Sequence, residues 1–272
     1  MRLDRWLVAH GHADTRSRAR WLIESGEVWV GGQPCRKPSL EVSAASQLHI
    51  RCAGLRYVSR GGLKLEHALK TLQLEVRGLV AFDIGASTGG FTDCLLQHGA
   101  HRVYALDVGT GQLHPSLRDD ARVIAFEGQN VRTFPPTALK ESVDLITVDV
   151  SFISLALILP LLPSFLCPGG IVLALIKPQF EVGAHDVGRG GIVRDASARA
   201  RAVQRILEMA IASGFDVIQT IDTPRIQARR NQERFVCLVW VATDRPPLQD
   251  LSRCRVSRSL PLTRTPALRE NA

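Results

Sequence analysis

Four residues of the sequence could perform acid–base chemistry together: Lys64, Asp149, Lys177 and Glu233. Asp149 and Lys177 each end an apolar stretch typical of a buried strand, and Glu233 precedes another such stretch. A lysine can accept a proton only if burial or a neighbouring cation lowers its pKa, and an adjacent carboxylate can orient it. Each residue alone also has an ordinary explanation, because lysines are usually solvated, Asp149 could cap a turn, and Glu233 could pair with a nearby arginine.

A glycine-rich segment suggests a binding loop in front of these residues. Residues 79–83 form a short apolar stretch that ends in Asp83, and Gly85, Ser87 and Gly89 precede a helix expected at 91–98. A strand, a glycine turn and a helix bring backbone amides and a helix N-terminus to a ligand. The spacing is neither a Walker A loop nor a GxGxxG motif. The acid at Asp83 would repel a pyrophosphate but would suit a ligand that carries an amino group or a sulfonium.

A second acid narrows the choice of ligand. Asp107 ends the stretch 103–107, 24 residues after Asp83, where nucleotide-binding folds usually grip ribose hydroxyls. The pair of acids around the glycine loop predicts S-adenosylmethionine as the cofactor.

The elements needed to hold these residues follow the same alternating pattern. Further apolar strands are expected at 144–149, 171–176 and 235–241, with an amphipathic helix at 199–212. Buried strands that alternate with helices predict an α/β fold with a Rossmann-like, doubly wound sheet. Ligands bind at the carboxyl ends of such strands, which is where the predicted site residues fall.

The N-terminal part has a different character. Residues 1–64 hold 11 basic and 5 acidic side chains, whereas residues 65–243 hold 17 and 18. Apolar spacing predicts two short helices before Gly26 and strands at 28–30 and 48–50, which together make a small α/β module. A basic module beside a neutral domain suits binding to a polyanion. The candidate RNA-contacting residues are Arg2, Arg5, Arg16, Arg18, Arg20, Arg36 and Lys37.

Two sets of motifs resemble known families. The run Arg-Leu-Asp-Arg-Trp-Leu-Val at 2–8, the segment 15–32 and Lys-Pro at 37–38 resemble the RNA-binding domain of the ribosomal protein S4 type. The segments 57–65, 83–96, 107–113, 149–155 and 177–181 resemble the TlyA family of FtsJ-like rRNA 2'-O-methyltransferases. These two similarities cover residues 1 to about 241.

The second resemblance implies methyl transfer from S-adenosylmethionine to a ribose 2'-hydroxyl of ribosomal RNA, typically of a cytidine. It implies Lys177 as the base, Asp149 as the group that orients it, Lys64 as the residue that positions the ribose or assists Lys177, and Glu233 as the partner of Lys64. The implied cofactor contacts are Asp83, Gly85, Ser87 and Gly89 around the methionine part, Asp107 at the ribose and Asn130 near the adenine. One departure from the family pattern affects Glu233, since Arg230 replaces a glycine before it and Arg234 is inserted after it.

The expected organisation is an RNA-binding domain at 1–56, a linker at 57–62, the methyltransferase domain at 63–243 and a disordered basic tail at 244–272. We expect ribosomal RNA or ribosomal subunits as partners, a monomer and a cytoplasmic location. The six scattered cysteines lack CxxC spacing, which argues against a metal site, and no apolar run reaches the ~18–20 residues that span a bilayer. Two alternatives remain: an RNA-binding protein with an inactive methyltransferase domain, and a membrane-active protein, since members of this family have been called haemolysins.

Overall fold

The computed structural model describes residues 1–13, 16–43, 46–50, 56–224 and 231–241. The predicted basic tail at 244–272 lies outside these described residues. The chain divides into two compact units, Met1–Ser59 and Arg60–Ala272, and each is described by itself. The division falls within the predicted linker, whose last three residues belong to the first helix of the larger unit.

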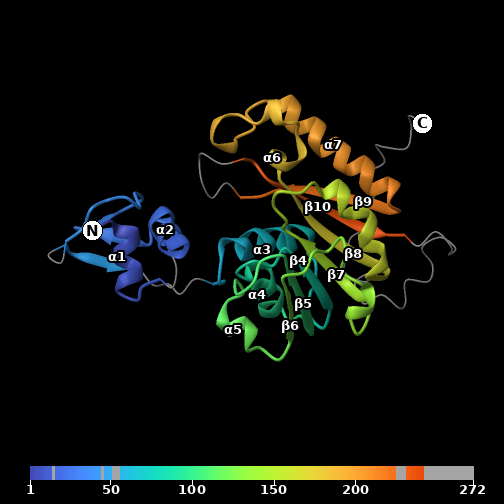
Figure 1. Ribbon diagram of the computed structural model, residues 1–272, viewed down its shortest axis with the longest axis horizontal. Coiled ribbons are helices and arrows are strands. Elements are labelled where there is room, and N and C mark those ends of the chain that lie inside the picture. Colours follow the sequence, from blue (N-terminus) through green and yellow to red (C-terminus); the bar gives the residue numbers. More distant parts are fainter. Residues whose placement is uncertain (14–15, 44–45, 51–55, 225–230, 242–272) are drawn as a thin grey trace. The chain divides into compact units, whose positions relative to one another are not determined.

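The N-terminal unit is a small α/β module (Figure 1). Its elements are α1 (Leu3–Ala9), α2 (Arg16–Ser25), β1 (Val28–Val30), β2 (Gln33–Pro34) and β3 (Leu48–Ile50). The strands form an antiparallel sheet in the order β2-β1-β3. Leu3 and Leu7 of α1 pack against Ala19 and Ile23 of α2, and all four are fully buried. The helical spacing seen in the sequence therefore marks the true core, whereas the two-residue strand β2 carries no such signal.

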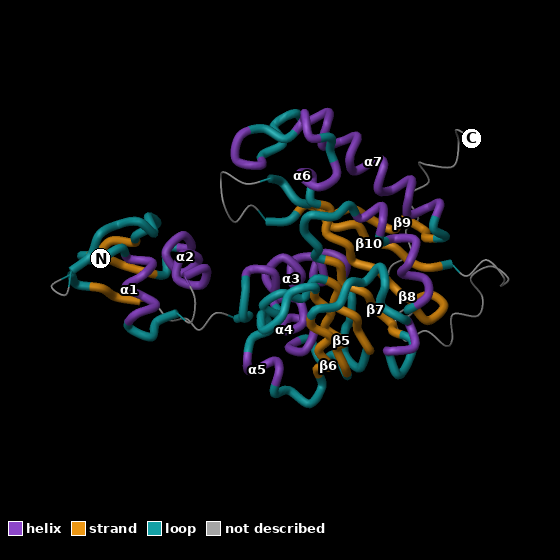
Figure 2. The backbone as a smooth tube through the Cα atoms, in the orientation of Figure 1, coloured by secondary structure: helices purple, strands orange, loops and turns teal. Residues whose placement is uncertain are grey.

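The larger unit is built on a seven-stranded sheet in the order β6-β5-β4-β7-β8-β10-β9 (Figure 2). Its strands are β4 (Val80–Ile84), β5 (Arg102–Asp107), β6 (Val123–Glu127), β7 (Val143–Val148), β8 (Leu166–Ile176), β9 (Phe215–Asp222) and β10 (Arg234–Trp240). Its α-helices are α3 (Arg60–Leu72), α4 (Gly90–Gln97), α5 (Pro115–Arg118), α6 (Pro178–Glu181) and α7 (Ala196–Ala212). Short 3-10 turns are η1 (Pro136–Ala138), η2 (Leu155–Leu157), η3 (Leu159–Ser164), η4 (Ala184–Asp186) and η5 (Arg189–Gly191). Five strands from β6 to β8 run parallel and β10 is antiparallel to both neighbours, so the predicted α/β, Rossmann-like fold is confirmed.

Both faces of this sheet are covered, which explains why its central strands are apolar throughout. On one face, Phe82 and Ile84 of β4 join a core with Ile206 and Ala210 of α7 and the turns η2 and η3. On the other face, α3 packs beside α4, and Phe91 of α4 contacts the ring of Phe235 in β10. No helix in the described part of the chain is long and apolar enough to cross a membrane.

The order of the strands creates the site. β4 has β5 on one side and β7 on the other, and a ligand crevice forms outside the carboxyl ends of strands where the connections diverge in this way. The carboxyl ends of β5, β4, β7 and β8 lie in a row along one edge. This row brings four predicted site residues together, because each is the last residue of its strand or directly follows it: Asp107, Gly85, Asp149 and Lys177.

Candidate active site

The loop after β4 touches the end of β7. Gly85 has a φ of +84°, which a residue with a side chain rarely adopts, and a Cβ there would lie 2.7 Å from the carbonyl oxygen of Asp149. Gly85 donates its amide to Leu106 in β5, and Asp149 donates its amide to Ile84 in β4. The glycine is therefore needed to bring the loop against the backbone that carries Asp149.

Asp107 closes the same loop from the side of β5. Its Oδ2 accepts a hydrogen bond of 2.7 Å from the Ser87 amide, and its Oδ1 accepts one of 2.7 Å from the Gly109 amide. Ser87 itself has a φ of +50° and donates its hydroxyl to Gln112, 3.3 Å away. A Cβ on Gly89 would lie 2.2 Å from a methyl group of Leu117, so this glycine makes room for the protein's own side chain.

Asp83 lies inside the molecule rather than in the crevice. Its side chain is fully buried, and its carboxylate accepts hydrogen bonds from the hydroxyls of Thr92 in α4 (2.7 Å) and Thr147 in β7 (2.9 Å). Burial raises the pKa of Asp83 to about 6, against the opposing effect of the two hydroxyls. The sequence suggested a carboxylate beside the ligand, whereas the structure places this one beneath the loop, where it ties α4 and β7 to β4.

Asn130 stands in the loop after β6 and is exposed. Its side-chain oxygen accepts a hydrogen bond of 3.0 Å from the Arg132 amide, which forms a local turn. The neighbouring Gln129 donates its amide to the backbone of Asp107. This loop is thus attached to the end of β5, although the Asn130 side chain is engaged within its own turn.

Lys177 and Asp149 form an ion pair between the ends of β8 and β7. The Lys177 Nζ atom lies 2.7 Å from Asp149 Oδ1 and donates a 2.9 Å hydrogen bond to the hydroxyl of Ser151. The two side chains are 11% and 22% exposed, so the pair is accessible to a ligand but largely shielded from water. The parallel pairing of β7 and β8 brings together these two residues, which are 28 positions apart in the sequence.

Lys64 and Glu233 form a second ion pair, of 2.5 Å between Nζ and Oε2. Arg234 pairs with Ile176 across β10 and β8, so Glu233 and Lys177 occupy the next positions at the same end of those strands. The unusual Arg234 does not disturb this pair, because its guanidinium turns to Asp222 in β9, 2.7 Å away. The two predicted lysine–acid pairs therefore meet at one edge of the sheet.

Three residues near this edge had no role assigned from the sequence. Ser151 contacts Lys177, as described above. Phe152 has a φ of +66°, is 91% exposed and packs against Phe180, with ring centroids 5.1 Å apart. Glu181 is buried and accepts hydrogen bonds from the Ser154 hydroxyl (2.5 Å) and the Leu155 amide (2.8 Å). All three belong to the motifs at 149–155 and 177–181, so the motifs contained the signal but not the roles. Within the described residues, no group of three or more histidine, cysteine, aspartate or glutamate side chains could hold a metal ion.

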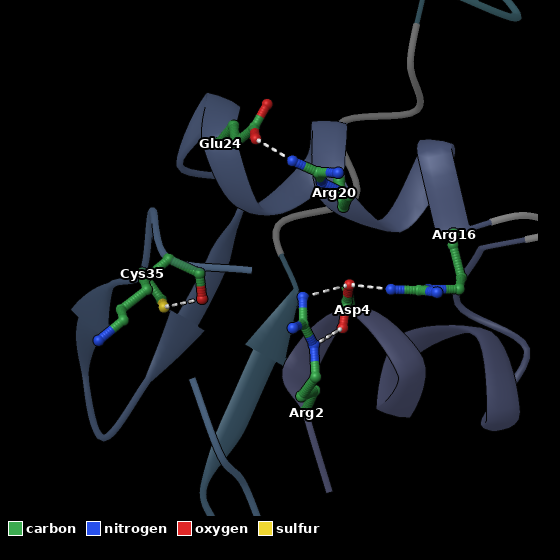
Figure 3. Close-up of polar contacts among 7 residues, drawn as sticks. Arg2, Asp4, Arg16, Arg20, Glu24 and Cys35 are labelled. Carbon is green, nitrogen blue, oxygen red and sulfur yellow. Dashed lines mark hydrogen bonds and ion pairs between the residues drawn. The ribbon is translucent and has the colours of Figure 1, made fainter. Parts of the chain in front are cut away.

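The candidate RNA-contacting residues gather in the N-terminal unit. Arg2 and Arg16 both contact Asp4, and Arg20 lies 3.7 Å from Glu24 (Figure 3). Arg2 precedes α1 rather than lying on it. The remaining residues are Arg5, Arg36 and Lys37, which are exposed, and Arg18, whose side chain lies outside the description.

The two units match two known families. Residues 57–240 match the FtsJ-like methyltransferase family, and residues 1–48 match the S4 domain. A Mycobacterium tuberculosis protein named 16S/23S rRNA (cytidine-2'-O)-methyltransferase TlyA is 42% identical over 243 residues, which cover 89% of this chain and 90% of that protein. Hemolysin A from Brachyspira hyodysenteriae is 38% identical over 234 residues, covering 86% and 97% respectively. A solved structure, a proposed hemolysin from Streptococcus thermophilus, is 40% identical with a TM-score of 0.71 and covers 90% of each chain.

The larger unit has a seven-stranded sheet with a glycine loop at the strand β4, where the strand order reverses, and the N-terminal unit is an S4 domain. Together they define the class of the protein: a methyltransferase with an S4-type RNA-binding domain. The chain belongs to the FtsJ-like methyltransferase family and, within it, to the group represented by TlyA.

Proposed function

We propose that this protein transfers a methyl group from S-adenosylmethionine to a ribose 2'-hydroxyl of ribosomal RNA, with a cytidine as the target nucleotide. The observation that carries this proposal is the pair of lysine–acid contacts, Lys177 with Asp149 and Lys64 with Glu233, at the same edge of the sheet as Gly85. The names of relatives such as the Mycobacterium tuberculosis protein support the choice of substrate.

The residues around the crevice suit the cofactor. When bound, S-adenosylmethionine supplies a methyl group on a positively charged sulfur. Gly85, Ser87 and Gly89 form a tight loop that would hold its methionine part, and the Asp107 carboxylate stands at the strand end where ribose hydroxyls are gripped. Asn130 lies on the loop attached to Asp107, on the side proposed for the adenine. Asp83 acts indirectly in this scheme, since it is buried and fixes the strand and helix on either side of the loop.

The chemistry requires the ribose hydroxyl to lose its proton as it attacks. Lys177 is the proposed acceptor of that proton: its ammonium group, paired with Asp149, first releases a proton to water, and the free Nζ then takes the proton of the attacking hydroxyl. The methyl group would come from the bound S-adenosylmethionine, which would leave as a neutral thioether. Asp149 and Ser151 hold the Lys177 side chain in place through their contacts with Nζ. Lys64, held by Glu233, positions the ribose. This positioning matters because alignment of the attacking oxygen with the methyl group supplies much of the acceleration.

Phe152 gives the site a surface for a nucleotide base. Phe152 combines a positive φ with a 91% exposed aromatic ring, and its ring packs against that of Phe180. Both features are unfavourable in a folded chain, and such strained residues cluster at functional sites. Enzymes that modify a nucleotide in folded RNA take it out of its stack and hold its base against aromatic side chains. Phe152 is placed to do this within three residues of Asp149.

The arginines of the N-terminal unit account for RNA binding in this proposal. Arg2, Arg5, Arg16, Arg18, Arg20, Arg36 and Lys37 would contact phosphates. Duplex RNA is recognised mainly through its backbone and shape, so a basic surface with few aromatic side chains is suitable.

Two measurements test the proposed function. Calorimetric titration of the full chain with S-adenosylmethionine is expected to give one binding site. Ribose-methylation mapping of ribosomal RNA, with and without the gene, is expected to reveal a cytidine that loses its 2'-O-methyl group. RNA binding without cofactor binding would instead support an RNA-binding protein with an inactive methyltransferase domain. Unchanged methylation in the mapping would refute the proposed activity.

A further inference from the structure

A buried carboxylate lies between two of the arginines in the N-terminal unit (Figure 3). Asp4 is fully buried, and both of its oxygens are engaged. Oδ1 accepts a hydrogen bond from Arg2 Nε at 3.0 Å, while Oδ2 accepts one from Arg2 Nη2 at 3.0 Å and one from Arg16 Nη2 at 3.1 Å. Asp4 thus binds Arg2 through two parallel hydrogen bonds and draws Arg16 to the same point.

The charges of this cluster do not cancel. Two guanidinium groups surround one carboxylate, so one positive charge remains. The Arg2 and Arg16 side chains are 41% and 55% exposed, and a guanidinium has five N–H donors. Of the ten donors that the two guanidinium groups have together, two from Arg2 and one from Arg16 bond with Asp4, so most of their donors are not used by the carboxylate.

The other described arginines of the predicted RNA surface have weaker contacts, and Arg36 donates a long hydrogen bond of 3.5 Å to the Glu24 carbonyl. Arg20 meets Glu24 at 3.7 Å, four residues along the same helix, which is a surface pair of small energetic value. Arg5 is exposed. A guanidinium that is already fixed loses less conformational freedom when it binds a phosphate, so Arg2 and Arg16 are the better prepared of these groups.

We propose that Asp4 is a positioning residue for RNA binding: it holds the guanidinium groups of Arg2 and Arg16 side by side, so that together they bind one RNA phosphodiester. This inference rests on the proposed function, since it assumes that the N-terminal unit binds ribosomal RNA. Asp4 does not contact the RNA itself. The Asp4 carboxylate repels a phosphate by its charge. It nevertheless favours phosphate binding, because it holds the guanidinium groups of Arg2 and Arg16 in place.

The variant Asp4→Asn tests the proposal, because repulsion of the phosphate and positioning of the arginines predict opposite changes in RNA affinity. If Asp4 acted only through its charge, its removal would strengthen binding to RNA. If it positions the arginines, Asp4→Asn weakens binding about tenfold, and the slope of log affinity against log salt becomes shallower by about one. The measurement is the affinity of the full chain for purified bacterial ribosomal RNA, from about 50 to 200 mM salt.

Three further variants complete the design. Glu24→Gln removes the acid beside Arg20 and is expected to leave RNA affinity unchanged or slightly tighter. Leu7→Ala destabilises the same unit through its core and is expected to keep normal RNA affinity below its unfolding temperature, which separates loss of stability from loss of positioning. In a background with Arg2→Ala and Arg16→Ala, Asp4→Asn is expected to cause no further loss.

The proposal is overturned if Asp4→Asn binds RNA as well as or better than the unmodified chain with the same salt slope. It is also overturned if the loss of affinity persists in the background that lacks both arginines, because Asp4 would then act only as part of the scaffold. Failure of the unmodified chain to bind RNA at all would instead refute the RNA-binding part of the proposed function. Cofactor affinity, measured on every variant, is expected to stay unchanged.

Discussion

The two units each contain a fully buried aspartate, and their surroundings shift its pKa in opposite directions. The hydrogen bond from Arg2 is the main cause that lowers the pKa of Asp4 to about 2. Burial raises the pKa of Asp83 to about 6, although Thr92 and Thr147 donate hydroxyls to it. Guanidinium charges compensate for the lost hydration of a carboxylate, whereas hydroxyl dipoles compensate only in part.

The difference indicates how each unit is organised. The N-terminal unit uses a buried negative charge to arrange cations at its surface, as an RNA-binding module requires. The larger unit uses hydroxyl donors, without a cation, to hold its buried aspartate and the frame around its glycine loop, and it has two lysine–acid ion pairs at the carboxyl ends of the strands. We therefore expect RNA binding and methyl transfer to be separable by mutation.

The largest effect is expected from Lys177→Ala, which removes the proposed base. Methylation should fall by roughly 10²–10⁴-fold, the usual contribution of a general base, while RNA binding stays normal because the N-terminal unit is intact. Initial rates with radiolabelled S-adenosylmethionine and RNA affinity on the same preparation measure both. The control is Lys70→Ala, a lysine on the exposed side of α3 that pairs with Glu66. Substantial turnover by the Lys177 variant would show that another group accepts the proton.

Gly85→Ala should affect the larger unit alone. Its new methyl group would lie 2.7 Å from a backbone oxygen, and the positive φ is unfavourable for alanine. We expect unfolding of this unit to become easier by ~2–4 kcal/mol and cofactor affinity to fall. Gly78→Ala is a matched control, because Gly78 has a φ of +77° but open space around it, so it reports the cost of the backbone conformation alone. Equal destabilisation by both variants would mean that the contact with Asp149 is unimportant.

The double variant Arg16→Glu with Arg20→Glu tests the other side of the comparison. Reversal of two charges should weaken RNA binding roughly 10–100-fold and make the salt dependence shallower by about one to two units of slope. Affinity for S-adenosylmethionine should not change. Arg77→Glu, at an 82% exposed arginine of the larger unit, controls for one charge reversal outside the N-terminal unit, half of the charge change in the double variant. If RNA affinity is unchanged in the double variant, the RNA-binding surface lies elsewhere.

The sequence predicted most of the sheet because its central strands are continuous apolar runs. β6 and β9 were missed because they are the two outermost strands of the sheet. Their residues are mostly half-buried and do not form continuous apolar runs. Helix α3 was missed for another reason: it begins with Arg60-Gly-Gly, which favours a loop, and packing of Leu65 and Leu69 overrides that preference.

The site could be predicted in part for similar reasons. Residues at strand ends were found, because the fold alone brings such ends together. The direction of a side chain was not available from the pattern: Asp83 points into the core because it is one residue before the end of β4, and strand residues alternate between faces. The sequence departs from the family pattern around Glu233, but Glu233 still pairs with Lys64. The neighbouring Arg234 does not compete for Glu233, because its guanidinium bonds with Asp222.

The most direct test of the contrast between the aspartates is Asp83→Asn, which is expected to change neither turnover nor RNA binding at neutral pH but only the pH dependence of stability. Because the pKa of Asp83 is raised from 3.8 to about 6, the folded protein binds this proton more tightly than the unfolded chain. This carboxyl therefore makes folding less favourable as the pH rises from about 4 to about 6, by up to ~3 kcal/mol, and has no further effect above that range. Asparagine does not titrate, so the stability of Asp83→Asn relative to the unmodified chain should increase across that window and then level off. Calorimetric unfolding at a series of pH values measures it, with Asp120→Asn, a partly exposed aspartate paired with Arg122, as the control. Parallel stability profiles for Asp83→Asn and the unmodified chain would mean that Asp83 titrates normally and that the hydroxyls of Thr92 and Thr147 replace its hydration in full.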